Sequence, residues 1–407
     1  MTWLPTKLGC LLTLEYGRAL PRHSRVETGG VPVAGSNGSD GFHDTALVQG
    51  PGIVVGRKGS AGKVVWYRSP FWPIDTTYFV HHDPRITNIR WLYYLLQSKR
   101  LERLNKVTGV PGLNRNDVYA ESCLLPTPKE QSRVAELLDE ADRLRRLRHD
   151  ANAKAARILP GLFLKIFGEP STNSAGWPIS TVGDVTTLVT SGSTPRGGAE
   201  VYVKEGPYII RSQNVLMNCL RLSDAARITA ETHQQMSRTW VREGDVLLNI
   251  TGASIGRVAW VKVLDGPANV NQHVCIIRPD PSLINPVFLS VCLSLPSMQA
   301  VINGIQTGAS RQALNHVQVR GMKVPVPPVS IQTRFSNQAQ MLEKCMERTD
   351  TVGQKLDRLW ENVMQQAFTG RLTARWREAH LNELMSEMAQ QAHALNLPLP
   401  HDLEVPS

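Results

Sequence analysis

Residues Gly52–Trp66, with the sequence GIVVGRKGSAGKVVW, carry the pattern that organises the whole chain. An apolar run leads into a turn that contains glycines, a basic residue follows, and a second apolar run closes the stretch. Residues Gly244–Trp260, GDVLLNITGASIGRVAW, repeat this order. Such a turn needs glycine where φ is positive or where another backbone comes close. Each stretch therefore predicts two β-strands joined by a glycine turn.

The repetition extends far beyond these two stretches. Trp3–Gly9 resembles Trp177–Gly183, and from Leu113 onward the matching residues stand at a constant separation of 201. The matches are Leu113–Asn114 with Leu314–Asn315, Pro126 with Pro327, Gln131 with Gln332, Arg133 with Arg334, Arg157 with Arg358, and Phe167 with Phe368. A constant separation means that these segments have equal length in both halves, so the chain is predicted to be an internal duplication.

Each half is predicted to contain a mixed α/β module, a proline-rich link and a long helix. The links are Leu125–Pro128 and Pro325–Pro328. Apolar residues at steps of three and four follow each link and mark one face of a helix of about 35–40 residues. A long helix with a narrow apolar stripe favours a partner helix. We expect the two duplicates to pair antiparallel about a pseudo-two-fold axis; the alternative is that each packs on its own module.

The composition favours a polyanionic partner. The formal net charge is +10 and the pI is about 9.4, which points first to nucleic acid or to an acidic surface. The six cysteines are scattered without a Cys-x-x-Cys pair, which is typical of reduced thiols in a cytoplasmic protein. The N-terminus shows no signal peptide pattern. The longest apolar run, near Val287–Leu295, is too short to span a bilayer.

Sequence motifs of catalysis are not found. The stretch Gly56–Lys63 looks briefly like a phosphate-binding loop, but Arg57 stands where that motif needs glycine, and Val64 stands where it needs Ser or Thr. No Gly-x-Gly-x-x-Gly, His-Glu-x-x-His or Gly-x-Ser-x-Gly occurs. The segment with which amino-methyltransferases hold a flipped base is also missing. The sequence therefore predicts a binding protein with no metal site and no catalytic residue.

The order of these features along residues 3–372 resembles the specificity (S) subunits of type I restriction–modification systems. No single motif is specific, but the duplicated order is. The resemblance implies an α+β fold, with two duplicated α/β target recognition domains separated by two long antiparallel, coiled-coil helices. The implied boundaries are recognition domains at 1–127 and 171–327 and spacer helices at 128–170 and 328–370. The tail at 371–407 is longer than the repeat requires and receives no role from the resemblance; its own pattern over Trp376–Leu397 predicts an amphipathic helix for capping or docking.

The resemblance also implies a function. Each recognition domain would read one half of a bipartite, asymmetric site in double-stranded DNA, and the helices would set the spacing between the halves. Two methyltransferase (modification) subunits would dock on the helices, and motor–nuclease (restriction) subunits would join them. Adenine methylation or restriction would be carried out by these partners. S-adenosylmethionine, ATP and Mg would belong to the partners, so that no cofactor is bound by this chain.

Candidate DNA contacts lie in the turns. Base reading needs Arg or Lys for guanine and Asn or Gln for adenine, while phosphates are held by cations, hydroxyls and free N–H groups. In the first half the candidates are Arg22, Ser36, Asn37, Arg57, Lys58, Ser60 and Lys63, with the loop 108–114. In the second half they are Arg196, Arg211, Ser212, Gln213, Asn214, Thr251, Ser254, Arg257, Arg311 and Gln312, the last two within the loop 307–315.

Two other interpretations remain open at this point. The chain could be the specificity subunit of a related system in which one partner fuses methyltransferase and nuclease. It could also be a non-catalytic coiled-coil scaffold with two protein-binding domains, although the net charge and the basic turns argue against this. The structural alternative for each candidate residue is a solvated turn, or a side chain that caps its own loop.

Overall fold

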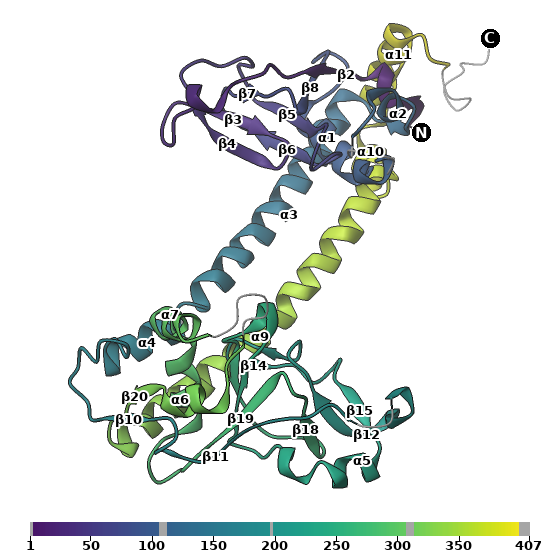
Figure 1. Ribbon diagram of the computed structural model, residues 1–407. Helices are drawn as coiled ribbons and strands as arrows, with labels where there is room; N and C mark the ends of the chain where they lie inside the picture. The colour runs from purple at the N-terminus through teal and green to yellow at the C-terminus, as the bar shows by residue number, and fades with distance from the viewer. Residues whose placement is uncertain (1–2, 106–111, 196–197, 307–312, 399–407) are drawn as a thin grey trace. The chain divides into compact units, whose positions relative to one another are not determined.

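The computed structural model describes residues 3–105, 112–195, 198–306 and 313–398, which divide into two compact units (Figure 1). The first unit is Met1–His149 with Val352–Ser407, and the second is Asp150–Thr351. Each unit is a mixed α/β structure with small sheets and cores of its own. The fold is thus of the mixed class that the sequence predicts, and each unit is described below by itself.

The first unit is built on a four-stranded antiparallel sheet with the order β2-β8-β5-β6. A three-stranded sheet, β4-β3-β7, and a two-stranded sheet, β1-β9, accompany it. The strands are β1 Leu4–Lys7, β2 Leu12–Tyr16, β3 Val31–Gly35, β4 Gly38–His43, β5 Gly52–Gly56, β6 Val64–Tyr67, β7 Trp72–Pro73, β8 Thr77–His82 and β9 Ser122–Leu125. The helices that lie wholly in this unit are α1 Ile89–Ser98, α2 Arg115–Tyr119, α10 Ala374–Ala379 and α11 Leu381–Leu395.

The second unit also contains a four-stranded antiparallel sheet, with the order β11-β19-β16-β17. It is accompanied by the sheets β15-β12-β18, β10-β20 and β13-β14. The strands are β10 Ile179–Thr181, β11 Thr186–Ser191, β12 Tyr202–Ile210, β13 Val215–Leu216, β14 Cys219–Leu220, β15 Ala226–Ile228, β16 Val246–Asn249, β17 Val258–Trp260, β18 Ala268–Val270, β19 Val274–Pro279 and β20 Lys323–Pro325. The helices are α4 Ile158–Phe167, α5 Ala230–Gln235, α6 Pro286–Ser294, α7 Pro296–Gly304 and α8 His316–Gly321.

The strands of the two units follow the same scheme. In each four-stranded sheet the strand that comes first in the sequence, β2 or β11, lies at one edge and pairs with the strand that comes last, β8 or β19. The hairpin β5–β6 or β16–β17 completes the sheet on the other side of that last strand. Each three-stranded sheet contains one parallel pair, β3 with β7 and β12 with β18. The strands β5 and β16 are buried along their whole length. Their unbroken apolar runs suit strands that are covered on both faces.

One helix packs against each hairpin, and its start is held in the same way in both units. Asn88 caps α1 by accepting hydrogen bonds from the backbone N–H groups of Arg90 and Trp91. Asn285 caps α6 in the same way through Val287 and Phe288. A capping asparagine satisfies backbone donors that have no partner within the helix. Both helices therefore begin at a fixed point beside the hairpin.

A buried glutamine locks each capped helix to the start of a long helix. Gln131 accepts a hydrogen bond from the backbone N–H of Asn88 (2.7 Å) and donates to the carbonyls of Ile86 and Pro126. Gln332 accepts from the backbone N–H of Asn285 (2.8 Å), and it donates to the carbonyls of Leu283 and Pro327. Both glutamines are fully buried. Replacing either glutamine removes hydrogen bonds from buried backbone groups and destabilises the fold.

The two predicted long helices differ. α9, Val329–Phe368, has 40 residues, as predicted. The first predicted helix is interrupted: α3 covers Pro128–Ala155, and α4 begins at Ile158. Proline at 160 lacks the N–H that would bond to the carbonyl of residue 156, and its ring clashes with that carbonyl. The expectation of one continuous helix is therefore wrong at this point.

Both long helices contact neighbouring elements within each unit. In the first unit, Arg145 of α3 donates to Asp357 of α9 (2.8 Å) and lies over the ring of Trp360. In the second, the ring of Phe335 of α9 packs at 5.5 Å from that of Phe163 in α4. The start of α3 is also buried in the core of its own unit, through Val134, Ala135 and Leu138.

The C-terminal segment is helical, as expected, and docks on the first unit. Met388 and Ala392 of α11 belong to the same core as Trp3 and Leu4. Glu130, at the start of α3, is fully buried and accepts hydrogen bonds from Trp3 Nε1 (2.8 Å), Thr373 Oγ1 (2.6 Å) and Arg377 Nε (2.8 Å). The two ends of the chain are thus joined through one carboxylate.

No single helix among the described residues is long and apolar enough to cross a membrane. The bent pair of helices α6 and α7 is long and apolar enough when the two are taken together, but this match rests on length and composition alone. Residues Val287–Leu293 of α6 are buried in the protein core.

Candidate nucleic-acid interface

The glycine turn of the first unit owes its shape to a close contact. Gly62 has a φ of +88°, and a Cβ atom at this position would lie 2.4 Å from the backbone nitrogen of Glu102. In the second unit Gly256 has a φ of +86°, and its Cβ would lie 2.4 Å from Oε1 of Gln299. The predicted positive φ is confirmed for both glycines, whereas a close backbone neighbour is found only at Gly62.

Four of the candidate residues in the first unit come together at two adjacent turns. Ser60 and Lys63 lie in the turn between β5 and β6, and Ser36 and Asn37 lie between β3 and β4. Lys63 Nζ donates to the backbone oxygen (2.9 Å) and to Oδ1 (2.7 Å) of Asn37. These polar side chains are therefore held as one group. Arg22 is exposed in the short 3₁₀ helix Arg22–Ser24 and has no described contact with the group.

Arg57 belongs to a cationic corner at one end of the four-stranded sheet. Its guanidinium donates to the backbone oxygen of Asp75 (Nη2, 2.6 Å) and lies 5.3 Å from the centre of the Tyr16 ring. Arg115, the first residue of α2, lies 5.3 Å from the same ring. Tyr16 is 52% exposed. We name the group Tyr16, Arg57, Lys58 and Arg115 the first corner.

The first corner is fixed to the loop that precedes α2. The backbone N–H of Leu113 donates to the oxygen of Arg57 (2.9 Å), and Lys58 forms a β-bridge with Gly112. Tyr78 donates its hydroxyl to the oxygen of Leu113, and burial together with a hydrogen bond to Tyr16 raises the pKa of Tyr78 to about 12. Tyr78 is therefore a neutral donor at physiological pH.

The first corner is rich in cations. Among the residues that the structure describes, no carboxylate forms an ion pair with Arg57, Lys58 or Arg115. An exposed aromatic ring with two guanidinium groups near it offers cations and a stacking surface. Both features suit contact with phosphates and with bases.

The second unit has a corner at the corresponding place, with different side chains. Thr251 follows β16 and forms a β-bridge with Ala313, as Lys58 does with Gly112. The N–H of Leu314 donates to the oxygen of Ile250 (2.9 Å), as that of Leu113 does to Arg57. His316, the first residue of α8, contacts the N–H (2.9 Å) and the hydroxyl (3.0 Å) of Ser191 at the end of β11.

Further hydroxyl, amide and imidazole groups lie in the turns at this end of the sheet. Thr251 Oγ1 is hydrogen-bonded to His273 Nδ1, and Thr194 Oγ1 donates to Gln272 Oε1 (2.5 Å). We name the group Ser191, Thr251, Gln272, His273 and His316 the second corner. It offers hydroxyl, amide and imidazole groups in place of the arginine and lysine side chains of the first corner.

The other candidates of the second unit lie in two turns. Ser254 ends the 3₁₀ turn Gly252–Ser254, and the exposed Arg257 donates its N–H to the oxygen of Ser254 (3.1 Å). Arg211, Ser212 and Gln213 follow β12. Asn249 Nδ2 at the end of β16 donates to the oxygen of Ser212 (2.8 Å), which ties this second turn to the sheet beside Thr251.

Asn214 is a correction to the predicted interface. Its side chain is fully buried, accepts a hydrogen bond from the N–H of Arg211 (3.0 Å), and donates to the oxygen of Arg221 (3.2 Å). A buried amide whose bonds all go to its own loop shapes that loop. The structure therefore contradicts a direct DNA contact at Asn214. Arg196, Arg311 and Gln312 lie outside the described residues.

Sequence reasoning missed the residues that complete the two corners. Arg115 and His316 follow directly after Asn114 and Asn315, so extending the repeated Leu-Asn pair by one residue would have found them. Tyr16, Gln272 and His273 carry no local motif. They reach the corners through strand pairing, because Tyr16 is opposite Tyr78 and Ser191 is opposite Cys275.

Within the described ranges, no group of three or more His, Cys, Asp or Glu residues could hold a metal ion. The grouped residues are those of a binding surface: cations, hydroxyls, amides and imidazoles in exposed turns.

Known proteins with the same features are DNA specificity subunits. The family model for the type I restriction modification DNA specificity domain matches residues 1–156 and 175–358. The EcoBI specificity subunit of Escherichia coli is 27% identical over 194 residues, covering 47% of this chain and 40% of that protein. The EcoprrI specificity subunit of Escherichia coli is 25% identical over 142 residues, covering 34% and 35%. The aligned part is thus less than half of each of these relatives.

Solved structures show the same fold. The S subunit of a type I restriction–modification system from M. genitalium superposes with a TM-score of 0.60 at 16% identity, covering 90% of this chain and 96% of that one. A chain from a structural study of complex assembly and conformational transition in the type I R-M system gives a TM-score of 0.52 at 16% identity, with 91% and 98% covered. Because the family model matches most of its length, this chain belongs to the family of type I restriction–modification DNA specificity subunits.

Proposed function

We propose that this chain reads a bipartite, asymmetric site in double-stranded DNA, with one half-site read at the first corner and the other at the second. The observation that carries the proposal is the pair of corners. They occupy corresponding places in the two units, yet one presents guanidinium groups and the other presents hydroxyl, amide and imidazole groups. Surfaces that differ in this way select different bases.

The duplicated arrangement supports the bipartite reading. The two units share one strand order in their four-stranded sheets, one glutamine lock and one glycine turn, which supports duplicated recognition domains. In our proposal the long helices pair antiparallel as a coiled coil and set the number of base pairs between the half-sites, by the same logic that relates protein geometry to half-site spacing in other DNA-binding proteins. Two domains on one chain also gain affinity through effective concentration.

The chemistry in this proposal belongs to partner subunits. Two methyltransferase subunits and the motor–nuclease subunits would supply the active sites, together with S-adenosylmethionine, ATP and Mg. The chain itself would direct adenine methylation or restriction without a catalytic residue of its own. A related arrangement, with methyltransferase and nuclease fused in one partner, would use this chain in the same way.

The first experiment is co-expression with a candidate methyltransferase subunit, followed by methylation-sensitive long-read sequencing of the host DNA. Adenine methylation confined to a split, non-palindromic motif, present only when this chain is expressed, is the expected result, and it supplies both half-sites. A stable complex without new methylation would contradict the role in directing methylation. No complex at all would favour the scaffold interpretation.

A further inference from the structure

The end of α1 and the last turns of α9 border a cationic groove in the first unit. The groove has a volume of about 860 Å³. Among the described residues that line it, one carries a carboxylate, Glu361, and four carry positive charges: Lys99, Arg100, Arg145 and Arg358. Arg145 also donates to Asp357 (2.8 Å), so the groove and its edge hold four cations and two carboxylates. The groove therefore has an excess of positive charge.

Two of these cations are available to bind an anion. Arg100 and Arg358 are exposed, and within the described ranges neither side chain forms an ion pair. The side chain of Arg145 is 47% exposed and lies 5.8 Å from the centre of the Trp360 ring. The groove thus presents three guanidinium groups to solvent, and two of them have no partner charge.

The groove begins beside the glycine turn between β5 and β6. A Cβ atom at Gly62 would lie 2.5 Å from the carbonyl carbon of Leu101, the residue after Arg100. The same turn carries Lys63, one of the predicted DNA contacts. Arg100 has a φ of +46°, a left-handed conformation that glycine and asparagine adopt more easily than arginine. The cations of the groove therefore continue the polar surface of this turn.

The corresponding part of the second unit lacks these cations. Residues 295–301, which follow α6, contain no lysine or arginine. Ser297 in this segment is hydrogen-bonded to Glu169. Met346 stands at the constant separation of 201 from Arg145. The excess of positive charge at this place is thus a property of the first unit.

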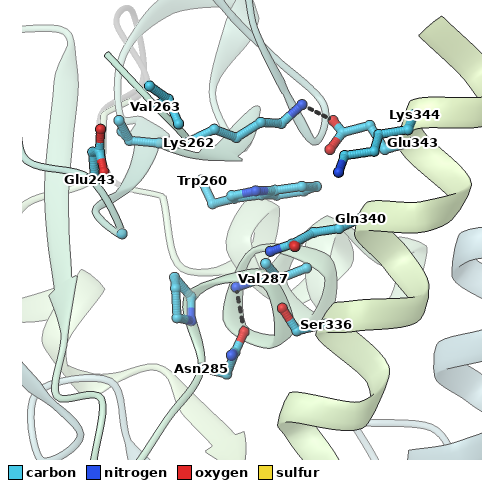
Figure 2. Close-up of a pocket in the computed structure, with 13 residues that line it drawn as sticks. Glu243, Trp260, Lys262, Val263, Asn285, Val287, Ser336, Gln340, Glu343 and Lys344 are labelled. Atoms are coloured by element: carbon cyan, nitrogen blue, oxygen red, sulfur yellow. Dashed lines mark hydrogen bonds and ion pairs between the residues drawn. The ribbon is translucent and has the colours of Figure 1, made fainter. Parts of the chain in front are cut away.

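A cleft of the second unit between its hairpin and α9 has balanced charges. Figure 2 shows Lys262 extended toward Glu343, with which it forms an ion pair. The other charged residues that line this cleft are Glu243 and Lys344. Two lysines and two glutamates leave no net charge, so this cleft does not attract a polyanion as the groove of the first unit does.

We propose that the cationic groove binds the sugar-phosphate backbone of double-stranded DNA, next to the half-site that the first unit reads. This contact rests on the proposed function and extends it from the bases to the backbone. Guanidinium groups bind phosphates strongly, and such contacts do not depend on the base sequence. A duplex that lies across the glycine turn passes beside Arg100. This continuity favours DNA over the alternative occupant, an acidic segment of a partner protein.

The test is binding of a random-sequence duplex to the full chain, followed by fluorescence anisotropy at several salt concentrations. Arg100→Asn with Arg358→Gln should reduce the slope of log K against log salt concentration by about 2, because each lost phosphate contact changes it by about 1. Asparagine is chosen because it tolerates the left-handed backbone. Arg100→Lys with Arg358→Lys keeps both charges and should keep most of the slope.

The matched control is Arg68→Gln with Arg375→Gln, which removes two exposed arginines of the same unit that do not line the groove. It should change the slope much less. The proposal is overturned if the groove variant, with an unchanged urea midpoint, keeps the slope of the wild type, or if the control loses as much. Loss of a co-purifying methyltransferase subunit with an unchanged slope would make the groove a protein-binding surface instead.

A second measurement locates the contact on DNA that carries the recognition site. Ethylation of phosphates beside one half-site should interfere with binding of the wild type and not with binding of the groove variant. Because the random duplex contains no recognition site, its slope tests the groove even if the bipartite reading fails. An unchanged slope would in turn leave base reading at the two corners unaffected.

Discussion

The two units share the same arrangement of strands and glutamine locks, but the start of the long helix is covered differently in each. In the first, Glu130 is buried beneath the C-terminal segment, and Gln391 of α11 donates to the same carbonyls of Ile86 and Pro126 that Gln131 already contacts. In the second, Ile331 stands before Gln332 where Glu130 stands before Gln131. At this position the first unit uses an ionic contact between Glu130 and a distant segment, whereas the second unit has an apolar residue, Ile331.

The largest expected effect comes from making the first unit resemble the second at this position. Glu130→Ile leaves Arg377 buried without its carboxylate, which typically costs about 3–5 kcal/mol of unfolding free energy. Urea denaturation of the full chain measures the loss. Adding Arg377→Met, which removes the unpaired charge, should recover most of the stability. A loss below 1 kcal/mol for the single variant would show that the ionic contact does not hold the segment.

The glutamine locks allow a direct comparison of the two units. Gln332→Ala leaves the carbonyls of Leu283 and Pro327 without this donor and should cost about 2 kcal/mol. Gln131→Ala should cost only about 1 kcal/mol, because Gln391 still donates to both carbonyls in the first unit. Adding Gln391→Ala should make the two units equal. Equal costs for the two single variants would contradict the shared role of Gln391.

The corners should separate the two half-sites. Replacing Arg57 and Lys58 by Ala should weaken binding at one half-site by about tenfold, the lower end of the usual effect of a lost base contact, and should spare the other. Competition binding with duplexes mutated in either half measures this. Arg143→Ala, an exposed arginine of α3 that pairs with Glu140, is the matched control. Unchanged affinity at both half-sites would rule out the first corner as a DNA contact.

A smaller effect should appear in the salt dependence. If Arg115 contacts a phosphate, Arg115→Ala should reduce the slope of log K against log salt concentration by about 1. His316→Ala should change the slope less than Arg115→Ala, because the second corner contains no arginine or lysine. Titrations at several salt concentrations measure both slopes. Equal changes would mean that the two corners do not differ in charge when they bind DNA.

The smallest effect concerns pH. Burial lowers the pKa of His82, which ends β8 where the second unit has Pro279 at the end of β19. The unfolded chain takes up a proton near the ordinary value of 6.5, whereas the folded chain resists it. The stability of the first unit should therefore be constant above that pH and decline as the pH falls through the window below it. Hydrogen exchange resolved by unit measures this, and His82→Gln should remove the decline.

The sequence predicted the features that repeat. The duplicated Leu-Asn pair, the glycine turns and the proline links all lie at corresponding places, because each reflects a local backbone requirement. Pro160 was visible, and the break in the first long helix follows from it. The role of Glu130 was not accessible, because its partners come from two distant parts of the chain, Trp3 from one and Thr373 with Arg377 from the other. Asn214 was misjudged because an amide in a turn can equally face solvent or its own loop.

The division of the chain has a consequence for its synthesis. The second unit, Asp150–Thr351, is one continuous segment, whereas the first needs Val352 onward. Phe368 lies against Trp91, and Ala367, Met388 and Ala392 belong to the core of the first unit. The first unit therefore cannot complete its core until Ala392 has been translated. On the ribosome, residues 150–351 should finish folding before the unit that precedes and follows them in sequence.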